Sequence, residues 1–346
     1  MFLAVLGFGF GRSFQKGGHL TDRGIGVVVL NWNNHPDTIV CLDSLAESNP
    51  RPEAVLVVDN ASHDDSVERI RAWAASRGES EPWLTILVAE GNLGFAGGNN
   101  LGLRHLTARP DLSHFLLLNN DATVAPNCFA QFSRAIEDVP DAGLLTGTIY
   151  EFADRSRAWY AGGHFELLRS RVRHDLEVPE GDQVIPTEFV CGCAMLIARP
   201  ALEAVGFLAE CYFPAYMEDA EYSYRVLAAG LPAVYAPAAR FYHKVGASVG
   251  MPGMAPLVIY TQIRHHGFFV RRNLHGIQKL GALLYLAMAK PARAMLELLS
   301  GRPRIAWAAL RGTLAGFFSS AAGRPLPPSS IPRQHPTKNS KQRPPP

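Results

Sequence analysis

The chain has 346 residues, of which 47% are hydrophobic and 18% are charged. This composition excludes an intrinsically disordered protein, and the length allows one large domain or two smaller ones. The five cysteines have neither the spacing of a zinc site nor the even number of a disulfide framework. Cys191 and Cys193 would share one face of a strand, so we expect them to be buried thiols in a reducing compartment.

The net charge of +2 conceals a strong asymmetry along the chain. Residues 264–346 carry 14 Lys or Arg side chains and a single acid, Glu297, whereas residues 1–263 carry 19 basic and 30 acidic groups. A basic C-terminal arm on an acidic body predicts an anionic partner, either a membrane surface or a nucleic acid. The alternative is a solubilising tail, which we prefer for the last 22 residues.

Two apolar stretches are candidates for membrane or export signals. Met1–Phe10 lacks a basic leader and a small-residue cleavage site, so it is not a convincing secretory signal. Leu280–Ala289 is far shorter than the roughly 20 residues that a membrane-spanning helix needs. We therefore expect no transmembrane helix.

The first 125 residues predict strands that alternate with helices. Short apolar runs indicate buried strands, and helices are expected from Pro36 to about Ser48, from about Val67, and near Gly97. Strands at intervals of about thirty residues, separated by helices, predict right-handed βαβ units and a parallel sheet. The expected strands are 27–30, 55–58, 85–88 and 115–118.

Each of these strands ends in polar or glycine-rich residues. Asn31, Asp59, the 91–100 loop and Asp121 should converge, because the carboxyl ends of parallel strands lie along one edge of the sheet. The glycines would let backbone N–H groups approach a ligand, and a helix starting near Gly97 would offer its N-terminus to phosphate. Taken alone, Asn119-Asn120-Asp121 is also ordinary turn chemistry.

After a helix beginning at Pro126, the pattern predicts an antiparallel insertion that faces a second substrate. Its strands are expected at 144–150, 158–165 and 184–197, and Arg169, Arg171 and Arg173 alternate on an exposed loop between them. Residues 192–195 could line the second substrate's pocket, but a buried strand explains them nearly as well.

Two further groups carry candidate chemistry. Glu218, Asp219 and Glu221 open a helix, where they either cap its N-terminus or supply a general base whose pKa is raised by aromatic neighbours. His243 and Lys244 precede a glycine-containing loop and could bind a metal or a pyrophosphate, although a lone histidine is more often structural.

In this order, the pieces resemble glycosyltransferase family 2, and within it the rhamnosyltransferase-like branch. The likeness covers about 220 residues and is carried by VVVLNWNN (27–34), VLVVDNAS (55–62), EGNLGFAGGNN (90–100), FLLLNND (115–121), GCAMLIARP (192–200), FPAYMEDAEYSYR (213–225) and FYHKVGAS (241–248). The resemblance implies an α/β protein with the GT-A nucleotide-sugar-binding fold: a Rossmann-like, mostly parallel sheet, an antiparallel acceptor-side insertion and a helical C-terminal arm. It also implies inverting sugar transfer from a nucleotide-sugar donor.

The resemblance also implies roles for individual residues. Asp219, paired with Glu218, would be the catalytic base, and Asp121 would bind a divalent metal, Mg²⁺ or Mn²⁺, with His243 nearby. Asn119 stands at the first position of the family's Asp-x-Asp element. The donor site would contain Asn31, Asp59, Asn92, Gly97, Asn100 and Asn120, with Asp59 on the nucleotide base. The acceptor pocket would contain Cys193, Met195 and Glu221.

We therefore expect four regions. They are an N-terminal extension (1–23), a catalytic domain (24–250, with a nucleotide-sugar half at 24–125 and an acceptor half at 126–250), a basic helical membrane-proximal region (251–323) and a disordered Pro-rich basic tail (324–346).

The expected partners are a dTDP- or UDP-sugar, a glycan or lipid-linked acceptor and an anionic membrane surface, but no nucleic acid. This places the protein in the cytoplasm, peripherally at the inner face of the cytoplasmic membrane. The main alternative is a catalytically inactive nucleotide- or glycan-binding module of the same fold. A nucleotidylyltransferase is disfavoured because residues 31–33 are not a glycine-rich basic loop.

Overall fold

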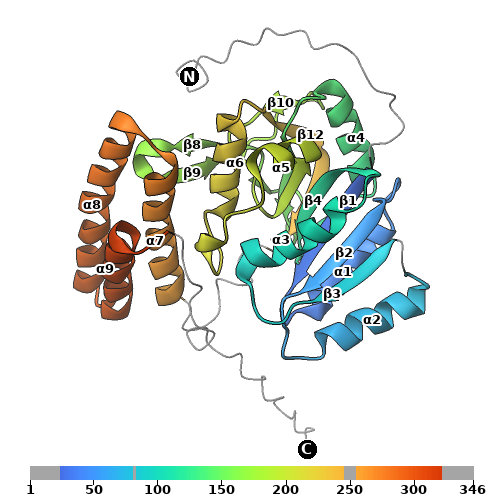
Figure 1. The fold of residues 1–346 in the computed structure, drawn as a ribbon, viewed down its shortest axis with the longest axis horizontal. Helices are drawn as coiled ribbons and strands as arrows, with labels where there is room; N and C mark the ends of the chain where they lie inside the picture. The colour runs from blue at the N-terminus through green and yellow to red at the C-terminus, as the bar shows by residue number, and fades with distance from the viewer. Residues whose placement is uncertain (1–23, 81–82, 245–254, 322–346) are drawn as a thin grey trace, which may run out of the picture.

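The computed structural model describes residues 24–80, 83–244 and 255–321 (Figure 1). The predicted N-terminal extension (1–23) and Pro-rich tail (324–346) lie outside the described residues. The same holds for residues 245–248 of the predicted loop after Lys244.

A ten-stranded sheet forms the centre of the molecule, in the order β10-β12-β6-β11-β4-β1-β2-β3, with β5 and β7 pairing at its side. Neighbours β3, β2, β1 and β4 are parallel, and β6 and β12 form a second parallel pair. The main strands are β1 (Gly24–Asn31), β2 (Ala54–Asp59), β3 (Leu84–Val88), β4 (Leu112–Asn119), β6 (Leu144–Glu151), β11 (Ala194–Ala198) and β12 (Ala233–His243). The predicted, mostly parallel α/β architecture is confirmed.

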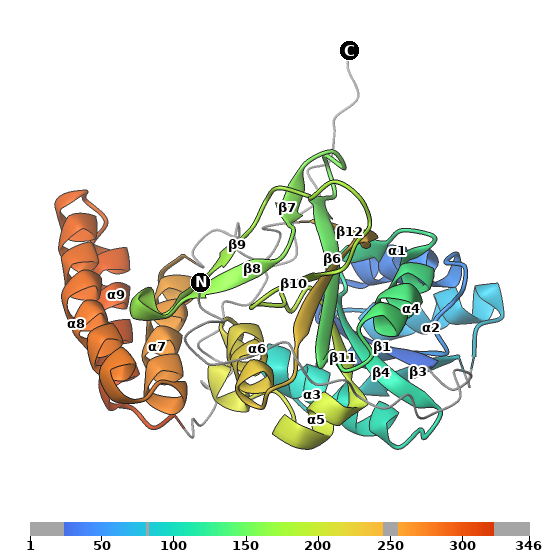
Figure 2. The ribbon, with the colours of Figure 1, turned by 90° about the horizontal axis from the view of Figure 1, so that it is seen from above.

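Helices cover both faces of this sheet, as Figure 2 shows. Alternate residues of one strand enter opposite cores, because side chains alternate across a strand. Val27 and Val29 belong to a core that also contains residues of helices α1 (His35–Ala46), α2 (Ser66–Arg77) and α4 (Cys128–Asp138). Val28 belongs to a second core with residues of α3 (Gly94–Thr107), α5 (Arg199–Val205) and α6 (Glu218–Ala228). Burial on both faces explains why these strands are almost entirely apolar.

The predicted antiparallel insertion is only partly correct. Residues 144–151 form β6, a strand of the central sheet that runs parallel to β12. Residues 194–198 form β11, which lies between β4 and β6 and is antiparallel to both. Sequence periodicity could not separate these cases, since a buried strand has the same apolar pattern whichever way it runs.

The remaining strands of this region are short. β7 (Ala158–Tyr160) and β10 (Ile185–Pro186) flank the sheet, and β5 (Ala122–Val124) pairs with the end of β12. β8 (Gly163–Glu166) and β9 (Arg171–His174) form a separate hairpin whose tip is the 3₁₀ turn η1 (Leu167–Arg169). Arg169, Arg171 and Arg173 thus lie on the η1 turn and β9 of a hairpin rather than on a loop.

Three helices follow the sheet: α7 (Ala255–Asn273), α8 (Gly276–Leu299) and α9 (Pro303–Phe318). Phe269 of α7 is fully buried and stacks on Phe165 of β8, with ring centroids 6.0 Å apart. Burial of one such side chain stabilises the fold by about 2 kcal/mol. Ala282 and Leu286 of α8 belong to the same core, so the arm is continuous with the sheet domain. Within the described ranges, none of the helices is long and apolar enough to span a membrane.

Candidate active site

A chain of polar side chains joins the ends of the first strands, as the sequence predicts. Asn31 Nδ2 donates to Asp59 Oδ2 at 2.7 Å, and Thr38 Oγ1 donates to Asn31 Oδ1 at 2.7 Å. Asn120 Nδ2 donates in turn to Thr38 Oγ1 at 2.9 Å. The network therefore runs from β2 through β1 and α1 to the residue beside Asp121. The sequence did not single out Thr38. Its place in the first turn of the helix that follows β1 could have indicated that it lies beside the strand ends.

Asp59 is fully buried, and its carboxylate is occupied by neighbouring groups. Besides Asn31, it accepts hydrogen bonds from the backbone N–H of Ser62 at 2.9 Å and from the Ser62 hydroxyl at 2.7 Å. These contacts fix the loop that follows β2. The role of Asp59 in binding a nucleotide base stays a prediction, and in this structure the carboxylate faces the protein.

The glycine-rich stretch serves packing more than ligand approach. A Cβ added to Gly98 or Gly102 would lie 2.4 Å from Leu30 or 2.5 Å from Val28, so these glycines allow α3 to approach β1 closely. The helix begins at Gly94, and Gly97 lies buried in its first turn.

The first N–H groups of α3 are already bonded to the protein, which corrects the expected open phosphate site. Leu93 N–H donates to Asn60 Oδ1 and Gly94 N–H to Asn92 Oδ1, while Phe95 N–H donates to the carbonyl of Pro214 at 2.7 Å. Asn92 therefore acts as a cap of α3.

A carboxylate and an imidazole meet at the end of β4. Asp121 Oδ1 lies 3.1 Å from His243 Nε2, and both side chains are about one-tenth exposed. The pairing of β5 with the end of β12 brings them together. Apart from this contact between the two side chains, Asp121 Oδ1 and His243 Nδ1 have no hydrogen-bond partner within the described ranges. Carboxylate oxygen and imidazole nitrogen are ligands of Mn²⁺, and their unused bonding capacity fits a divalent ion.

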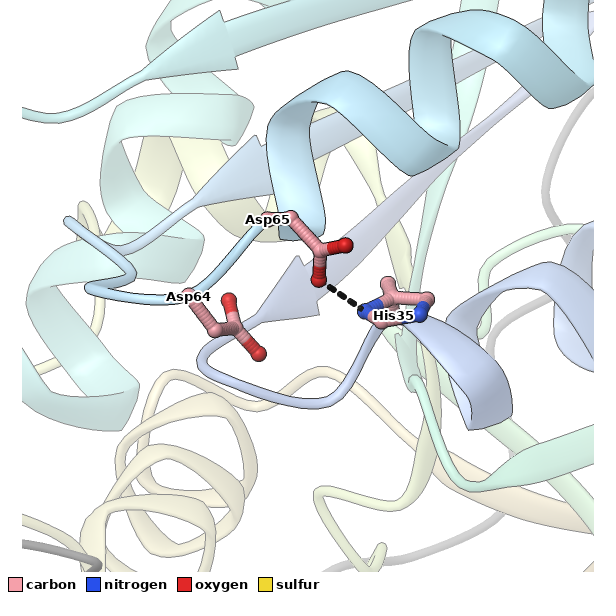
Figure 3. Close-up of side chains that lie close together, drawn as sticks. All are labelled: His35, Asp64 and Asp65. Carbon is pink, nitrogen blue, oxygen red and sulfur yellow. Dashed lines mark ion pairs between the residues drawn. The ribbon is translucent and has the colours of Figure 1, made fainter. Parts of the chain in front are cut away.

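Another group of possible metal ligands lies at the protein surface (Figure 3). His35 Nδ1 is 3.6 Å from Asp65 Oδ1, with Asp64 close by. Asp65 already pairs with Arg69 at 2.7 Å, and this hydrogen bond holds the pKa of the Asp65 carboxyl below its usual range. Because Arg69 already balances this charge, we assign no ion to the group.

Two carboxylates open α6 after a strained segment. Tyr216 and Met217 adopt φ values of 80° and 74°, a region that non-glycine residues rarely occupy, at a cost of about 1–3 kcal/mol each. Asp219 Oδ2 accepts a hydrogen bond from Gly192 N–H at 3.0 Å, and Oδ1 accepts one from Ala220 N–H at 2.8 Å. The strain and the bonds together fix the position of Asp219, with two lone pairs left for a ligand.

The two carboxylates differ in environment. Burial raises the pKa of Asp219, although the N–H bonds from Gly192 and Ala220 oppose the shift. Burial, followed by the charge of Asp219, raises the pKa of Glu218 well above its usual range. Glu218 is only 4% exposed, and its Oε2 has no partner in the described part of the chain, whereas Asp219 is partly exposed. Of the two predicted catalytic carboxylates, Asp219 is therefore the more accessible one.

A short backbone segment links residues 119–121 to the carboxylate of Asp219. Asn119 N–H donates to the carbonyl of Cys193 at 3.0 Å, and Gly192, one residue earlier, binds Asp219. Trp159 forms a second link: its ring makes edge contacts with His243 at 5.3 Å and with His174 at 4.8 Å. The negative charge of Asp219 reaches His174, where it opposes the lowering of the pKa by burial. Trp159 therefore contacts one residue of the predicted site, which sequence periodicity could not show.

Four predicted ligand residues are buried or bonded within the protein in this structure, and their roles in binding stay predictions. Met195 is fully buried in the core, and the thiol of Cys193 is 4% exposed, so a buried segment rather than an acceptor pocket explains them. Glu221 is fully buried and forms two 2.9 Å bonds to Arg225 Nε. Asn100 bonds to the backbone N–H and carbonyl of Leu208. The partner of Asn100 is 108 residues away in the sequence, whereas the partner of Glu221 lies only four residues along the same helix.

The fold is that of known glycosyltransferases. A mannosyltransferase from Pyrobaculum calidifontis, solved with GDP-Man and Mn²⁺, superposes with a TM-score of 0.55 at 17% identity, covering 89% of this chain and 91% of that one. GalNAc-T7, solved with UDP, GalNAc and Mn²⁺, gives a TM-score of 0.61 at 13% identity, covering 84% and 55%. These likenesses establish the GT-A fold.

The sequence comparisons go further. N-acetylglucosaminyl-diphospho-decaprenol L-rhamnosyltransferase of Mycobacterium tuberculosis is 25% identical over 311 residues, which cover 80% of this chain and 98% of the relative. The model of the family described as "Glycosyl transferase family 2" matches residues 26–206, more than half of the chain. The chain therefore belongs to glycosyl transferase family 2, and it is a glycosyltransferase.

Proposed function

We propose that the protein transfers a sugar, L-rhamnose in the first instance, from a nucleotide-sugar donor to a hydroxyl of a lipid-linked glycan, with inversion at the anomeric carbon. Support for the sugar and for the acceptor class comes from the mycobacterial relative, which is named for both. The donor is a dTDP- or UDP-sugar.

Asp219 is the general base in this proposal. The acceptor oxygen forms a bond to the anomeric carbon from the face opposite the diphosphate, the bond from that carbon to the donor oxygen breaks, and the hydroxyl proton moves to Asp219. The raised pKa of Asp219 suits this task, because a base works best when its pKa lies near the working pH. A single displacement of this kind needs no enzyme nucleophile.

Asp121 and His243 would hold a divalent ion, which would stabilise the charge of the diphosphate leaving group. Their separation of 3.1 Å and the burial of both side chains at the end of β4 support the assignment. Asn119 supplies an amide where a second carboxylate would strengthen the site, so we expect weak metal binding that becomes firm only with the donor diphosphate.

The observation that carries the proposal is the fixed, partly exposed carboxylate of Asp219, linked through Gly192 and Cys193 to the element that contains Asp121. The test is release of nucleoside diphosphate from dTDP-rhamnose and from a panel of UDP- and GDP-sugars. Each donor is assayed with and without a GlcNAc-diphosphate-lipid acceptor, in Mn²⁺, in Mg²⁺ and in EDTA. Acceptor-dependent release with one donor supports the proposal.

One observation favours the alternative of an inactive binding module, namely the amide of Asn119 in the metal element. That alternative expects a donor to raise the melting temperature of the protein without any release of nucleoside diphosphate. Full activity in EDTA would instead support the assignment as a glycosyltransferase and show that its reaction needs no metal.

A further inference from the structure

Exposed apolar side chains gather on two helices of the C-terminal arm. Of the nineteen large hydrophobic residues that are exposed in the described structure, twelve belong to α8 and α9. On a soluble surface such residues are normally scattered singly, and a contiguous group marks an interaction site. Figures 1 and 2 both show α8 at the outer edge of the molecule, with α7 between it and the sheet domain.

The apolar residues of α8 follow a helical period along one stripe. Their spacings of three, four or seven residues place them on one side of the helix. The inner side of α8 meets the core through Ala282 and Leu286, so the stripe faces outward. The stripe consists of Ile277, Leu280, Leu284, Met288, Met295 and Leu299, with exposed fractions from 53% to 79%.

Helix α9 carries a similar stripe and packs against α8. Trp307 is 61% exposed and Phe318 is 81% exposed, with Leu310 and Leu314 between them at helical spacing. An indole ring with an apolar body and a polar N–H is typical of residues at the boundary between lipid and water. We call the two stripes together the α8–α9 face.

The charges around this face have one sign. Between residues 276 and 318 the chain has six Lys or Arg side chains and one acid, Glu297. That acid is already paired with Arg302 at 2.8 Å and with Arg293 at 3.8 Å. Arg304 and Arg311 are exposed on α9. The excess of positive charge complements an anionic surface and disfavours a second copy of the same face.

A groove continues this face toward the sheet domain. It has a volume of about 570 Å³ and lies between α8 and the tip of the β8–β9 hairpin. Ile277, Gly281 and Leu168 line it, with Arg169 at its side. At its other end the hairpin carries His174, and the charge of Asp219 acts to raise the pKa of this histidine. The apolar surface thus extends from α8 onto the element that leads to the catalytic carboxylate.

From these observations we propose that the α8–α9 face docks on an anionic lipid bilayer, with the apolar stripes in the interfacial layer and the arginines at the headgroups. A helix with one apolar and one charged side lies in the plane of the interface, which agrees with the lack of a spanning helix in the described ranges. An enzyme docked in this way shares its surface with any lipid-linked acceptor.

The test is co-sedimentation of the full chain with vesicles of phosphatidylcholine alone or mixed with phosphatidylglycerol. The vesicles carry no acceptor, so the result does not depend on catalysis. We expect binding to the anionic vesicles that falls at least tenfold between 0.1 and 0.5 M salt, because salt screens the arginines. The double substitution Leu284→Glu/Met288→Glu, at two exposed positions, should weaken binding at least tenfold.

Matched controls separate this reading from others. Val40→Glu/Val88→Glu adds the same charge at exposed positions of α1 and β3, away from the arm, and should bind like the parent chain. Arg304→Gln/Arg311→Gln should reduce the salt dependence. Melting curves establish that each variant is folded. Equal loss of binding in the control variant, or no binding by the parent chain, would overturn the proposal. So would a dimer in sedimentation velocity that Leu284→Glu/Met288→Glu dissociates, since it would assign the face to a second copy.

Discussion

Replacing Asp219 by Asn tests the proposed base with little change in shape. Each carboxylate oxygen accepts one backbone hydrogen bond, from Gly192 at 3.0 Å and from Ala220 at 2.8 Å. Asparagine has one acceptor oxygen, and its amide group would face the second N–H donor. One backbone N–H therefore loses its partner, which costs about 1–3 kcal/mol of unfolding free energy.

The loss of charge offsets part of this cost. The pKa of Asp219 is raised in the folded protein, so the folded state binds its proton more tightly than the unfolded state does. This group therefore lowers the stability as pH rises from the unfolded pKa through the folded pKa, and an asparagine has no such effect. At pH 7 we expect a fall in melting temperature of a few degrees, at about 2–4 °C per kcal/mol for a protein of this size class.

Catalysis should suffer far more than stability. A general base contributes about 10²–10⁴-fold, so we expect Asp219→Asn to lose that much of kcat in acceptor-dependent release of nucleoside diphosphate. Donor affinity, measured by calorimetry, should stay within about twofold, since the base is not needed to bind the donor. In the parent enzyme, kcat/KM should rise with pH and level off above the raised pKa of Asp219, and the variant should lack this step.

Glu218→Gln is the matched control. The raised pKa of Glu218 favours its neutral acid, which glutamine imitates, so we expect a loss of less than tenfold. A loss below fivefold for Asp219→Asn, or equal losses in both variants, would refute the assignment of the base. A large loss of donor affinity in Asp219→Asn would place this residue in the donor site instead.

The other predictions concern the metal, the acceptor and the core. Asp121→Ala should abolish any response of activity to Mn²⁺, and Asn119→Asp should lower the Mn²⁺ concentration needed for half-maximal activity; full parent activity in EDTA would contradict both. Trp159→Ala should raise the KM for the acceptor about tenfold while leaving donor affinity unchanged, and the opposite pattern would move Trp159 to the donor side. Glu221→Gln should cost up to about 3 kcal/mol in denaturant unfolding, because it breaks the buried pair with Arg225.

The fold was largely readable from the sequence because its parallel strands are buried on both faces. Runs such as residues 55–58 and 115–118 are apolar throughout, and each ends at a polar residue that the structure places at the same sheet edge. The direction of β11 was not readable. Hydrophobic runs do not encode strand direction, and β11 is antiparallel to both of its neighbours.

The sequence indicated site residues where they form a local motif. It did not indicate residues that are brought together only by tertiary contacts. Asp121 and His243 meet as expected, because β5 returns the chain beside the end of β12. Glu221 stands two residues after Asp219 in the same helix, yet it faces Arg225 and the interior. The arginine four residues further along the helix was the local signal for this pair. Trp159 is connected to the site only through its ring contacts with His174 and His243, which come from other strands.

The contacts of helix α7 determine where a chimera between this enzyme and a relative can be joined. Arg264 Nη2 donates to the carbonyl of Phe213 at 2.6 Å, and His265 Nδ1 lies 2.9 Å from the carbonyl of Tyr216. Both carbonyls belong to the segment that precedes Asp219, so helix α7 supports the backbone that positions the proposed base. A chimera in which residues 26–206 are exchanged, the part that the family model matches, would keep the contacts of Arg264 and His265 with this segment. A crossover placed between α6 and α7 would instead join the segment before Asp219 from one protein to helix α7 of another. The two would not have evolved to make these hydrogen bonds.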